Sequence, residues 1–490
     1  MAISIITSPT LYQTVYNPIY TQVSSTLTSQ EAFSFIFDVY VNGVYITRDR
    51  LLPRPGTTNA IYSPARVLES YVSYDLTHNL IGNTSSLNCI DQYDIRLGEE
   101  YINYWSFYDT QYDSFSASSY TVLQGFAGVT HSFILNDYIA VSNTVYGTFN
   151  GIFKVVNIPN NYTVVINKNF ISTATNPGKA TWSDKRKSAY FSATQSGYSF
   201  NGVIQYEEIP TWSYNNYVMD TTGGKFLTKQ PYTTKTKLID RGSIGWLNTK
   251  DHTSTPNRKY YMSITPYVDY TPSTPILLSM LNMELSTTTN RKIQEFGIYP
   301  YNLNIRSQIE FSVDAINTTT TSYTIQIFYQ ELVSAPGVYV PISEIKRFEV
   351  DQCGTRFDPV RFMFINSLGQ FDYYNATLLS RTTVAVSRDT YTKTLPLNYT
   401  QGDRGKTVIN VNAQENYTIS TDWVSQETAH WLTYEFLTSN EIYVLDNTTG
   451  KITPIILNVG DWEDKKRVND KLLNYTITYS KTVPLNTRRN

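Results

Sequence analysis

Few residues in this 490-residue chain have the types and spacing that catalysis requires. The chain has 4 His and 2 Cys, and it lacks the Gly-x-Ser-x-Gly and His-Glu-x-x-His patterns of hydrolases and metalloproteases. His131 and Asp137 resemble parts of a catalytic group, but no nucleophile lies at a spacing that would complete it. We therefore interpret His131 and Asp137 as residues that stabilise a turn.

The segment Gly402-Asp403-Arg404-Gly405-Lys406-Thr407 ends like a phosphate-binding loop. That loop requires four residues between the first glycine and the Gly-Lys pair, and this segment has two. It also lies between two β-type segments, whereas a phosphate-binding loop joins a strand to a helix. The pattern predicts the tip of a β-hairpin.

Carboxylate pairs and thiols give equally little evidence of chemistry. Glu99-Glu100 and Glu207-Glu208 are adjacent, and adjacent residues of a strand point to opposite faces. A glycosidase with two carboxylates stays open, because the fold sets such a pair and the local sequence does not. Cys89 and Cys353 fit neither a disulfide framework nor a zinc site, so we interpret them as buried thiols. We expect no catalytic residue, no metal ion and no cofactor.

The composition favours sheets. Charged residues make up 16% of the chain, where about 25% is typical. The chain has 41 Tyr, and aromatic and β-branched residues fit a pleated, half-buried surface. Tyrosine is also enriched at protein interfaces, so two explanations stay open: contact between subunits, or a large core with Tyr in place of Leu.

Charge and hydropathy exclude two classes of protein. The net charge is −2, and the longest basic run is Lys465-Lys466-Arg467, so we expect no direct binding of nucleic acid. No apolar run approaches the ~20 residues of a membrane helix, and the start Met1-Ala2-Ile3-Ser4-Ile5 is unlike a signal peptide. We expect synthesis in a host cytoplasm and no membrane insertion.

Short strands separated by turns predict an all-β fold with one or two short helices. Asn42-Gly43, between two β-rich runs, predicts a hairpin, and Ser63-Pro64 predicts the start of a short helix. Four or five short strands between turn residues at 127–172 predict a small β-barrel inserted into a β-sandwich-like domain. We expect that domain to comprise 1–126 and 173–300.

A second β-sandwich-like domain is expected at 301–490. Phe311, Val313 and Ala315 alternate with polar residues, and so do Tyr323 to Tyr329. One amphipathic helix is predicted at 423–437, followed by a hairpin formed by 441–445 and 452–457. Leu473, Tyr475, Ile477 and Tyr479 alternate with polar residues and predict a half-buried strand.

Several segments resemble virion structural proteins of the tail, neck or baseplate type, from tailed bacteriophages of Bacteroidetes-type hosts. These segments are Asp38–Gly43, Ser63–Tyr71, Arg361–Tyr374, Trp431–Leu432, Leu437–Val444, Ile452–Ile456 and Asn474–Ile477. The 127–172 insert resembles a small barrel that is common in phage tail and virion proteins. The resemblance implies a non-enzymatic assembly subunit located in the virion, whose partners are other virion proteins and copies of itself.

Two alternatives stay open. One is a receptor-binding or glycan-degrading tail protein that contacts a host surface glycan or receptor. The other is a capsid-associated protein or a surface adhesin, and the missing signal peptide argues against the adhesin.

We predict a subunit interface in the last 70 residues or so. One helix can cover only one face of a sheet, which leaves the other face for contact with a neighbour. The predicted interface residues are Trp431, Tyr443, Asn474, Thr476 and Thr478. The basic run 465–467 would lie beside them.

Overall fold

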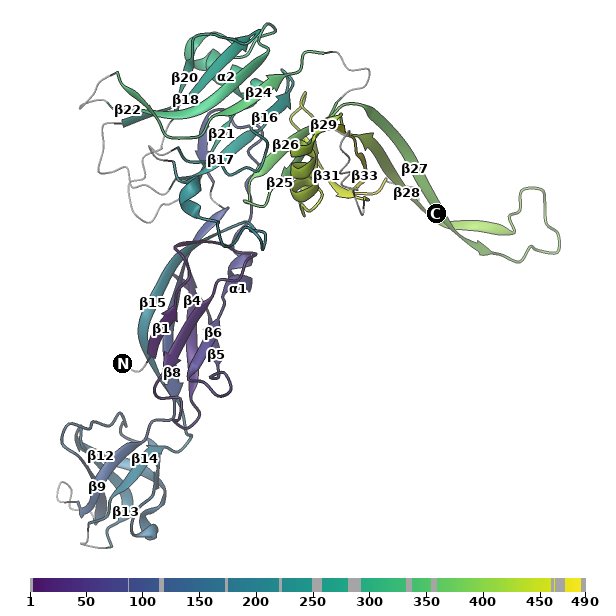
Figure 1. Cartoon of the computed structure of the whole chain (residues 1–490). Coiled ribbons are helices and arrows are strands. Elements are labelled where there is room, and N and C mark those ends of the chain that lie inside the picture. The colour runs from purple at the N-terminus through teal and green to yellow at the C-terminus, as the bar shows by residue number, and fades with distance from the viewer. Residues whose placement is uncertain are drawn as a thin grey trace. The chain divides into compact units, whose positions relative to one another are not determined.

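The structure of the chain is a computed structural model (Figure 1). Its first large sheet contains a hairpin that turns at Asn42-Gly43. Asn42 has φ +50° and Gly43 has φ +80°, as a type I′ turn requires, so the predicted hairpin is confirmed. The turn joins β4 (Ser34–Val41) to β5 (Val44–Leu51). The structure describes residues 3–86, 88–113, 119–171, 175–219, 223–248, 258–280, 292–331, 337–353, 359–459, 462 and 472–485.

The chain forms two compact units, and the N-terminal unit comprises Met1–Leu11, Pro18–Pro64 and Gln92–Gly197. Its larger sheet contains β5, β4, β8 (Ile90–Tyr101) and β15 (Ser188–Phe200) in that order. A smaller sheet has the order β1 (Ile3–Thr7), β3 (Thr21–Ser25) and β6 (Asn59–Tyr62). Phe37 of β4 stacks on Tyr62 of β6, with ring centroids 4.4 Å apart, so the two sheets pack as a sandwich.

A closed six-stranded barrel is inserted in the N-terminal unit. Its strands are β9 (Trp105–Tyr112), β10 (Tyr120–Gly125), β11 (Tyr138–Ser142), β12 (Gly151–Asn160), β13 (Thr163–Asn169) and β14 (Gly178–Trp182), and a short 3₁₀ helix, η1 (Gly147–Phe149), lies between β11 and β12. They close in the order β10-β13-β12-β11-β14-β9. Buried side chains such as Phe107, Leu123, Ile139 and Val164 fill the interior.

The all-β prediction is confirmed, including the small barrel. Among the described residues, helices account for 8% and strands for 51%, far from the third or so of helix in an ordinary globular protein. The barrel differs from the expected range 127–172, because β9, β10 and β14 lie outside that range. Closure of the barrel pairs residues far apart in the sequence, such as Trp105 of β9 with Ala180 of β14, and local turn signals do not indicate such pairs.

His131 and Asp137 stabilise the loop that precedes β11. His131 Nε2 donates to the carbonyl oxygen of Asn160 at 3.2 Å, and Asp137 Oδ2 accepts from the backbone N of Ile134 at 3.0 Å. Asp137 Oδ2 also accepts from Trp182 Nε1 at 3.0 Å. These contacts agree with the turn-stabilising interpretation.

The second unit comprises Tyr12–Asn17, Ala65–Asp91 and Tyr198–Asn490. It begins with β2 (Tyr12–Thr14) and the short helix α1 (Ala65–Glu69), which follows Ser63-Pro64 as predicted. β2 pairs in parallel with the end of β15. A short 3₁₀ helix, η2 (Tyr214–Tyr217), precedes a three-stranded sheet with the order β17 (Ser243–Asn248), β21 (Lys292–Gly297) and β7 (Asn83–Ser85).

Two seven-stranded sheets form the bulk of the second unit. The first has the order β16 (Thr233–Thr236), β24 (Lys346–Val350), β22 (Ser322–Glu331), β18 (Arg258–Val268) and β19 (Thr271–Pro272), with β20 (Ile276–Met280) and β23 (Tyr339–Pro341) paired to β18 and β22. The second has the order β26 (Phe371–Ala376), β25 (Val360–Ile365), β30 (Ile442–Leu445), β31 (Ile452–Leu457), β33 (Thr476–Lys481), β28 (Lys406–Ser420) and β27 (Leu379–Thr392). β29 (Val424–Ser425) pairs with β32 (Leu472–Leu473).

The expected strand through Phe311 is wrong, because the segment is a helix. α2 spans Pro300–Phe311, with Pro300 in the first turn, where its missing N–H costs no hydrogen bond. Leu303 and Ser307 are buried one helical turn apart, while Phe311 and Val313 are exposed. The alternation of three apolar residues was too short to outweigh this helical period. Tyr323 to Tyr329 do form a half-buried strand, β22.

The predicted helix at 423–437 is confirmed within narrower bounds. α3 (Gln426–Trp431) continues into a π-helical turn over Leu432–Phe436, and the hairpin β30–β31 follows. Trp431, Leu432 and Phe436 pack against one face of the second large sheet. Residues of the opposite face belong to a core that also holds Phe226, Trp246 and Tyr323, so this core contains residues from both sides of the expected border at 300.

Candidate assembly surface

Two of the five predicted interface residues are buried inside the second unit. Trp431 is 3% exposed, and its Nε1 donates to Asp372 Oδ2 at 3.0 Å. Tyr443 is 8% exposed, and its hydroxyl lies 2.7 Å from that of Tyr74 and donates to Glu441 at 2.9 Å. The packing of the chain itself accounts for Trp431 and Tyr443.

The other three predicted residues follow the expected alternation. Leu473, Tyr475, Ile477 and Tyr479 are buried, which confirms the alternation, but only Ile477 and Tyr479 lie in β33, whereas Leu473 ends β32. Asn474 and Thr476 are exposed and Thr478 is half-buried, so the structure places them on one polar surface. The carbonyl oxygen of Thr476 accepts from Trp462 Nε1 at 3.2 Å. The basic run 465–467 lies outside the described residues, and a subunit contact at this surface stays a prediction.

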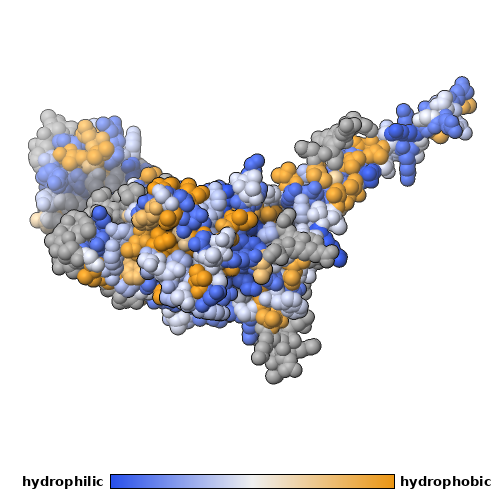
Figure 2. All heavy atoms as spheres, turned by 90° about the horizontal axis from the view of Figure 1, so that it is seen from above, coloured by the Kyte–Doolittle hydropathy of each residue, from blue (hydrophilic) through white to orange (hydrophobic). Residues whose placement is uncertain are grey.

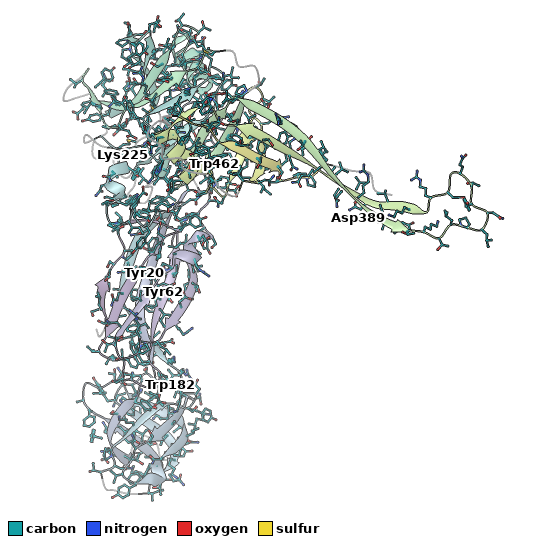
Figure 3. The ribbon with its side chains drawn as sticks, turned by 45° about the vertical axis from the view of Figure 1, so that its right-hand side comes forward. Tyr20, Tyr62, Trp182, Lys225, Asp389 and Trp462 are labelled. Carbon is teal, nitrogen blue, oxygen red and sulfur yellow. The ribbon has the colours of Figure 1, made fainter. Side chains whose placement is uncertain are left out.

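A long hairpin leaves the second large sheet. β27 and β28 pair from Leu379 opposite Ser420 to Thr392 opposite Lys406, but β28 pairs with β33 only from Asn416 to Ser420. We call residues 384–415, which lie beyond that shared part, the arm. Figure 1 shows the arm as a narrow projection from the sheet, and Figure 3 shows Asp389 on it, away from the part of the sheet beside Trp462.

Every residue from 380 to 404 is exposed, including apolar residues. Val384 and Val386 are 54% and 43% exposed on one face of the hairpin, where Val386 lies opposite Ala413. The other face has Ser387 opposite Asn412 and is polar. The arm is therefore amphipathic, and Figure 2 shows hydrophobic surface on its inner part.

The tip of the arm exposes three large apolar side chains. Leu397 is fully exposed at 102%, and Leu395 and Tyr399 are also exposed. The backbone N of Thr400 donates to the carboxylate of Asp403, which fixes a turn inside the predicted hairpin tip. The segment that resembled a phosphate-binding loop is thus confirmed as the end of a hairpin.

A groove lies near the point where β27 begins. It has a volume of about 810 Å³ and adjoins a smaller cavity of about 300 Å³, and the two share Lys235, Glu349, Asp351, Thr377 and Asp422. Lys235 Nζ lies 3.6 Å from Asp422, and Lys237 Nζ lies 3.2 Å from Asp351. Exposed Trp423 lines the cavity, and exposed Tyr270 lines the groove. Carboxylates and hydroxyls therefore line both hollows, and each hollow has one exposed ring in its lining.

Buried carboxyls elsewhere in the unit have structural partners. Burial raises the pKa of Asp372 to about 6 and the pKa values of Glu435 and Glu295 to about 7. Glu435 accepts hydrogen bonds from the backbone and hydroxyl of Ser367 at 2.6 and 2.9 Å. Glu435 lies in the π-helical turn after α3, and the loop at Ser367 covers its carboxylate.

The carboxylate pairs in the sequence do not form a site. Glu99 accepts from Ser25 and Glu100 binds Arg50, on opposite faces of β8. Glu208 pairs with Lys229 at 2.5 Å. No described group of three or more His, Cys, Asp or Glu residues could hold a metal ion. Cys89 is buried as expected, but Cys353 is exposed because it follows β24 at the rim of the groove.

Comparisons with known proteins leave the chain unassigned. No family model and no curated protein matches it. Among solved structures it is similar to the phage phi92 endosialidase at 10% identity, over 99% of this chain and 70% of that chain, with a TM-score of 0.16. It is similar to a Salmonella alpha-2-macroglobulin mutant at 9% identity, over 97% of this chain and 40% of that chain, with a TM-score of 0.14. Scores this low carry no argument. Among the described helices, none has the length and apolar character to cross a membrane.

Proposed function

We propose that this chain is a non-enzymatic virion assembly subunit of a tailed bacteriophage, in the tail, neck or baseplate. The observation that carries the proposal is the arm. An isolated two-stranded hairpin is marginally stable in water. Leu397 is fully exposed, so its side chain adds no hydrophobic stabilisation to the single chain. Contact with another protein would bury the exposed apolar side chains of the arm and stabilise it.

The resemblance to virion structural proteins supports the same role. It comes from segments in both units, including Asp38–Gly43 and Arg361–Tyr374. The polar surface with Asn474 and Thr476 supplies a second area for a wet contact between subunits.

A shortened arm tests the proposal. Replacing residues 387–412 with Asn-Gly joins Val386 to Ala413, which already lie opposite each other, through a two-residue turn. The removed side chains are mostly exposed, so the free energy of unfolding should change by no more than about 1 kcal/mol. Mass spectrometry of purified particles should find the parent chain and not the shortened chain.

A variant that changes the tip without shortening the arm serves as the matched control. Asn398→Ser alters one exposed polar residue beside Leu397 and should enter particles normally. Particles that lack the parent chain would contradict the virion role. Normal entry of the shortened chain would remove the arm as its evidence.

The groove favours a second candidate, a receptor-binding or glycan-degrading tail protein. Sugars stack on exposed rings such as Trp423 and Tyr270, and the hydroxyls of a sugar bind carboxylates such as Asp422 and Asp351. Incubation with capsular polysaccharide of the host tests this candidate. Release of reducing ends, abolished by Asp422→Asn, would favour it over the assembly role.

A further inference from the structure

The outer edge of β27 is open over an unusual length. Each of its 14 residues lies in the hairpin ladder with β28, and no described strand pairs with its other edge. An average strand has about 5–6 residues, and natural edge strands are usually protected by Pro or by bulges. β27 contains neither Pro nor Gly, and the one register shift of the hairpin, after Asp389, leaves the extra residue Ile409 on β28.

We propose that two copies of this chain join through this edge, with β27 antiparallel to β27 about a two-fold axis that passes beside Ala385. The two second sheets then form one continuous sheet. The partner is a second copy of this chain, and the pairing does not depend on the virion role.

The sequence of β27 complements itself about Ala385. Arg381 and Asp389 lie four residues on either side, so the axis places each Arg381 opposite Asp389 of the other copy, and two ion pairs form. Arg381 and Asp389 form no ion pair with any other residue that the structure describes. Opposite charges directly across a ladder stabilise a strand pair, and this pairing supplies them twice.

Neighbouring registers lack this match. Opposite residues of an antiparallel ladder point to the same face of the sheet. A two-fold axis perpendicular to the sheet keeps every residue on its own face, so the axis can move along the strand only in steps of one whole residue. A shift of the axis by one residue moves the pairing by two and places Arg381 opposite Ser387 or Tyr391. The axis at Ala385 therefore combines an overlap of nearly the whole strand with both ion pairs.

The same axis brings the exposed valines together. Val384 and Val386 lie one residue on either side of Ala385, so each lies opposite the other in the second copy. Four β-branched side chains then adjoin on one face of the joined sheet, where each is about half exposed in the single chain. In the pair, the apolar face of each arm therefore lies beside the apolar face of the other.

The tip of each arm reaches the groove of the other copy. Lys393 lies eight residues after Ala385 and Thr377 eight before it, so the two lie opposite each other in the pair. Thr377 and Leu378 line the groove. The charges are complementary in sign. The tip has Lys393, Arg404 and Lys406 against Asp403, and the groove has Asp269, Glu349, Asp351 and Asp422 against Lys235 and Arg347.

A cysteine placed at the axis tests the geometry. In a Cys353→Ser background, which removes the exposed thiol, Ala385→Cys should form a disulfide between copies under mild copper-phenanthroline oxidation. Opposite Cβ atoms in a ladder lie about 4.5–5.5 Å apart. Non-reducing gel electrophoresis should show a covalent dimer.

Ser387→Cys is the matched control on the same face of the same strand. Its two copies would be separated by four residues, or about 14 Å along the strands, beyond the reach of a disulfide. We expect about tenfold less covalent dimer than with Ala385→Cys. Equal crosslinking of both variants would overturn the register.

Charge exchange gives a second test. Arg381→Asp alone and Asp389→Arg alone each place like charges opposite each other twice, and each should weaken the dimer by roughly tenfold. The double variant restores opposite charges in exchanged order and should dimerise like the parent chain. Analytical ultracentrifugation measures all four proteins.

A parent chain that stays monomeric at the highest concentration reached would overturn the pairing, and so would a double variant as weak as the single variants. These outcomes differ from failure of the virion role. A chain that dimerises through β27 but is absent from particles would contradict the virion role and leave the pairing in place.

Discussion

Ile419 and Ile409 lie in the same strand, β28, and have opposite surroundings. Ile419 is 1% exposed in the core beneath α3, while Ile409 is 54% exposed on the arm. Both positions belong to an extended strand, which favours β-branched residues, but Ile419 lies opposite Ser380 and Ile477, whereas Ile409 is the unpaired residue at the register shift. Strand propensity therefore favours extended structure along the whole hairpin. Only the part of β28 that pairs with β33, Asn416 to Ser420, contributes to the core of the monomer.

The largest change in the free energy of unfolding is expected for a substitution of Arg361, which is buried in the second unit. Arg361 is 1% exposed, pairs with Asp240 at 3.0 Å and lies over the rings of Tyr299 and Tyr373. Arg361→Leu leaves Asp240 buried and unpaired, which should lower the free energy of unfolding by about 3–5 kcal/mol. Urea denaturation measures the change, and the additional substitution Asp240→Asn should recover part of the loss.

The matched pair Ile419→Ala and Ile409→Ala tests the comparison directly. Loss of a buried isoleucine side chain costs about 2–5 kcal/mol, because it removes apolar contacts and leaves a cavity. Ile409→Ala removes exposed atoms and should change stability by about 0.5 kcal/mol or less. Equal losses in thermal or urea unfolding would show that the arm belongs to the cooperative core.

Glu435 gives the second unit a stability that depends on pH. Burial raises its pKa to about 7, so ionisation is less favourable in the folded chain than in the unfolded one. The stabilisation that this carboxyl confers is complete below its unfolded pKa, near 4.5, and is lost as pH rises through about 7. Glu435→Gln should therefore reduce the fall in unfolding free energy between pH 4.5 and pH 8 by about 1–3 kcal/mol. Glu427→Gln, at an exposed position of α3, should leave the fall unchanged.

The smallest effect is a change in hydrogen exchange without a change in stability. Amides of β27 that point to its outer edge exchange quickly in dilute protein, because water reaches them. At high concentration the proposed pairing with a second copy should protect the same amides, while those of β33 stay protected throughout. Unchanged exchange in β27 over the whole concentration range would contradict the pairing.

Local patterns predicted much of this fold. The Asn42-Gly43 turn, the alternation from Leu473 to Tyr479 and the helical face with Trp431 each depend on neighbours in the sequence, and the structure agrees with all three. The expected range of the barrel is too narrow, because the barrel closes by pairing β9 with β14, which lie far apart in the sequence.

The sequence predicted the hairpin tip at 402–407 but not the length of the arm behind it, although the signal for that length is present. β27 and β28 have 14 and 15 residues without Gly or Pro, much longer than the average strand. Burial of Tyr443 was out of reach, because its partner Tyr74 lies far away in sequence, and so was the hydrogen bond from Trp431 to Asp372.

The barrel has its two chain ends side by side. β9 enters it and β14 leaves it, and Ala180 of β14 pairs with Trp105 of β9. An insertion whose ends meet imposes little loop-closure entropy on the host domain, so the sandwich can fold around barrels of different sequence or around a short turn. In evolutionary terms the barrel is an exchangeable cassette, and recombination could replace it without altering the sheets that carry it.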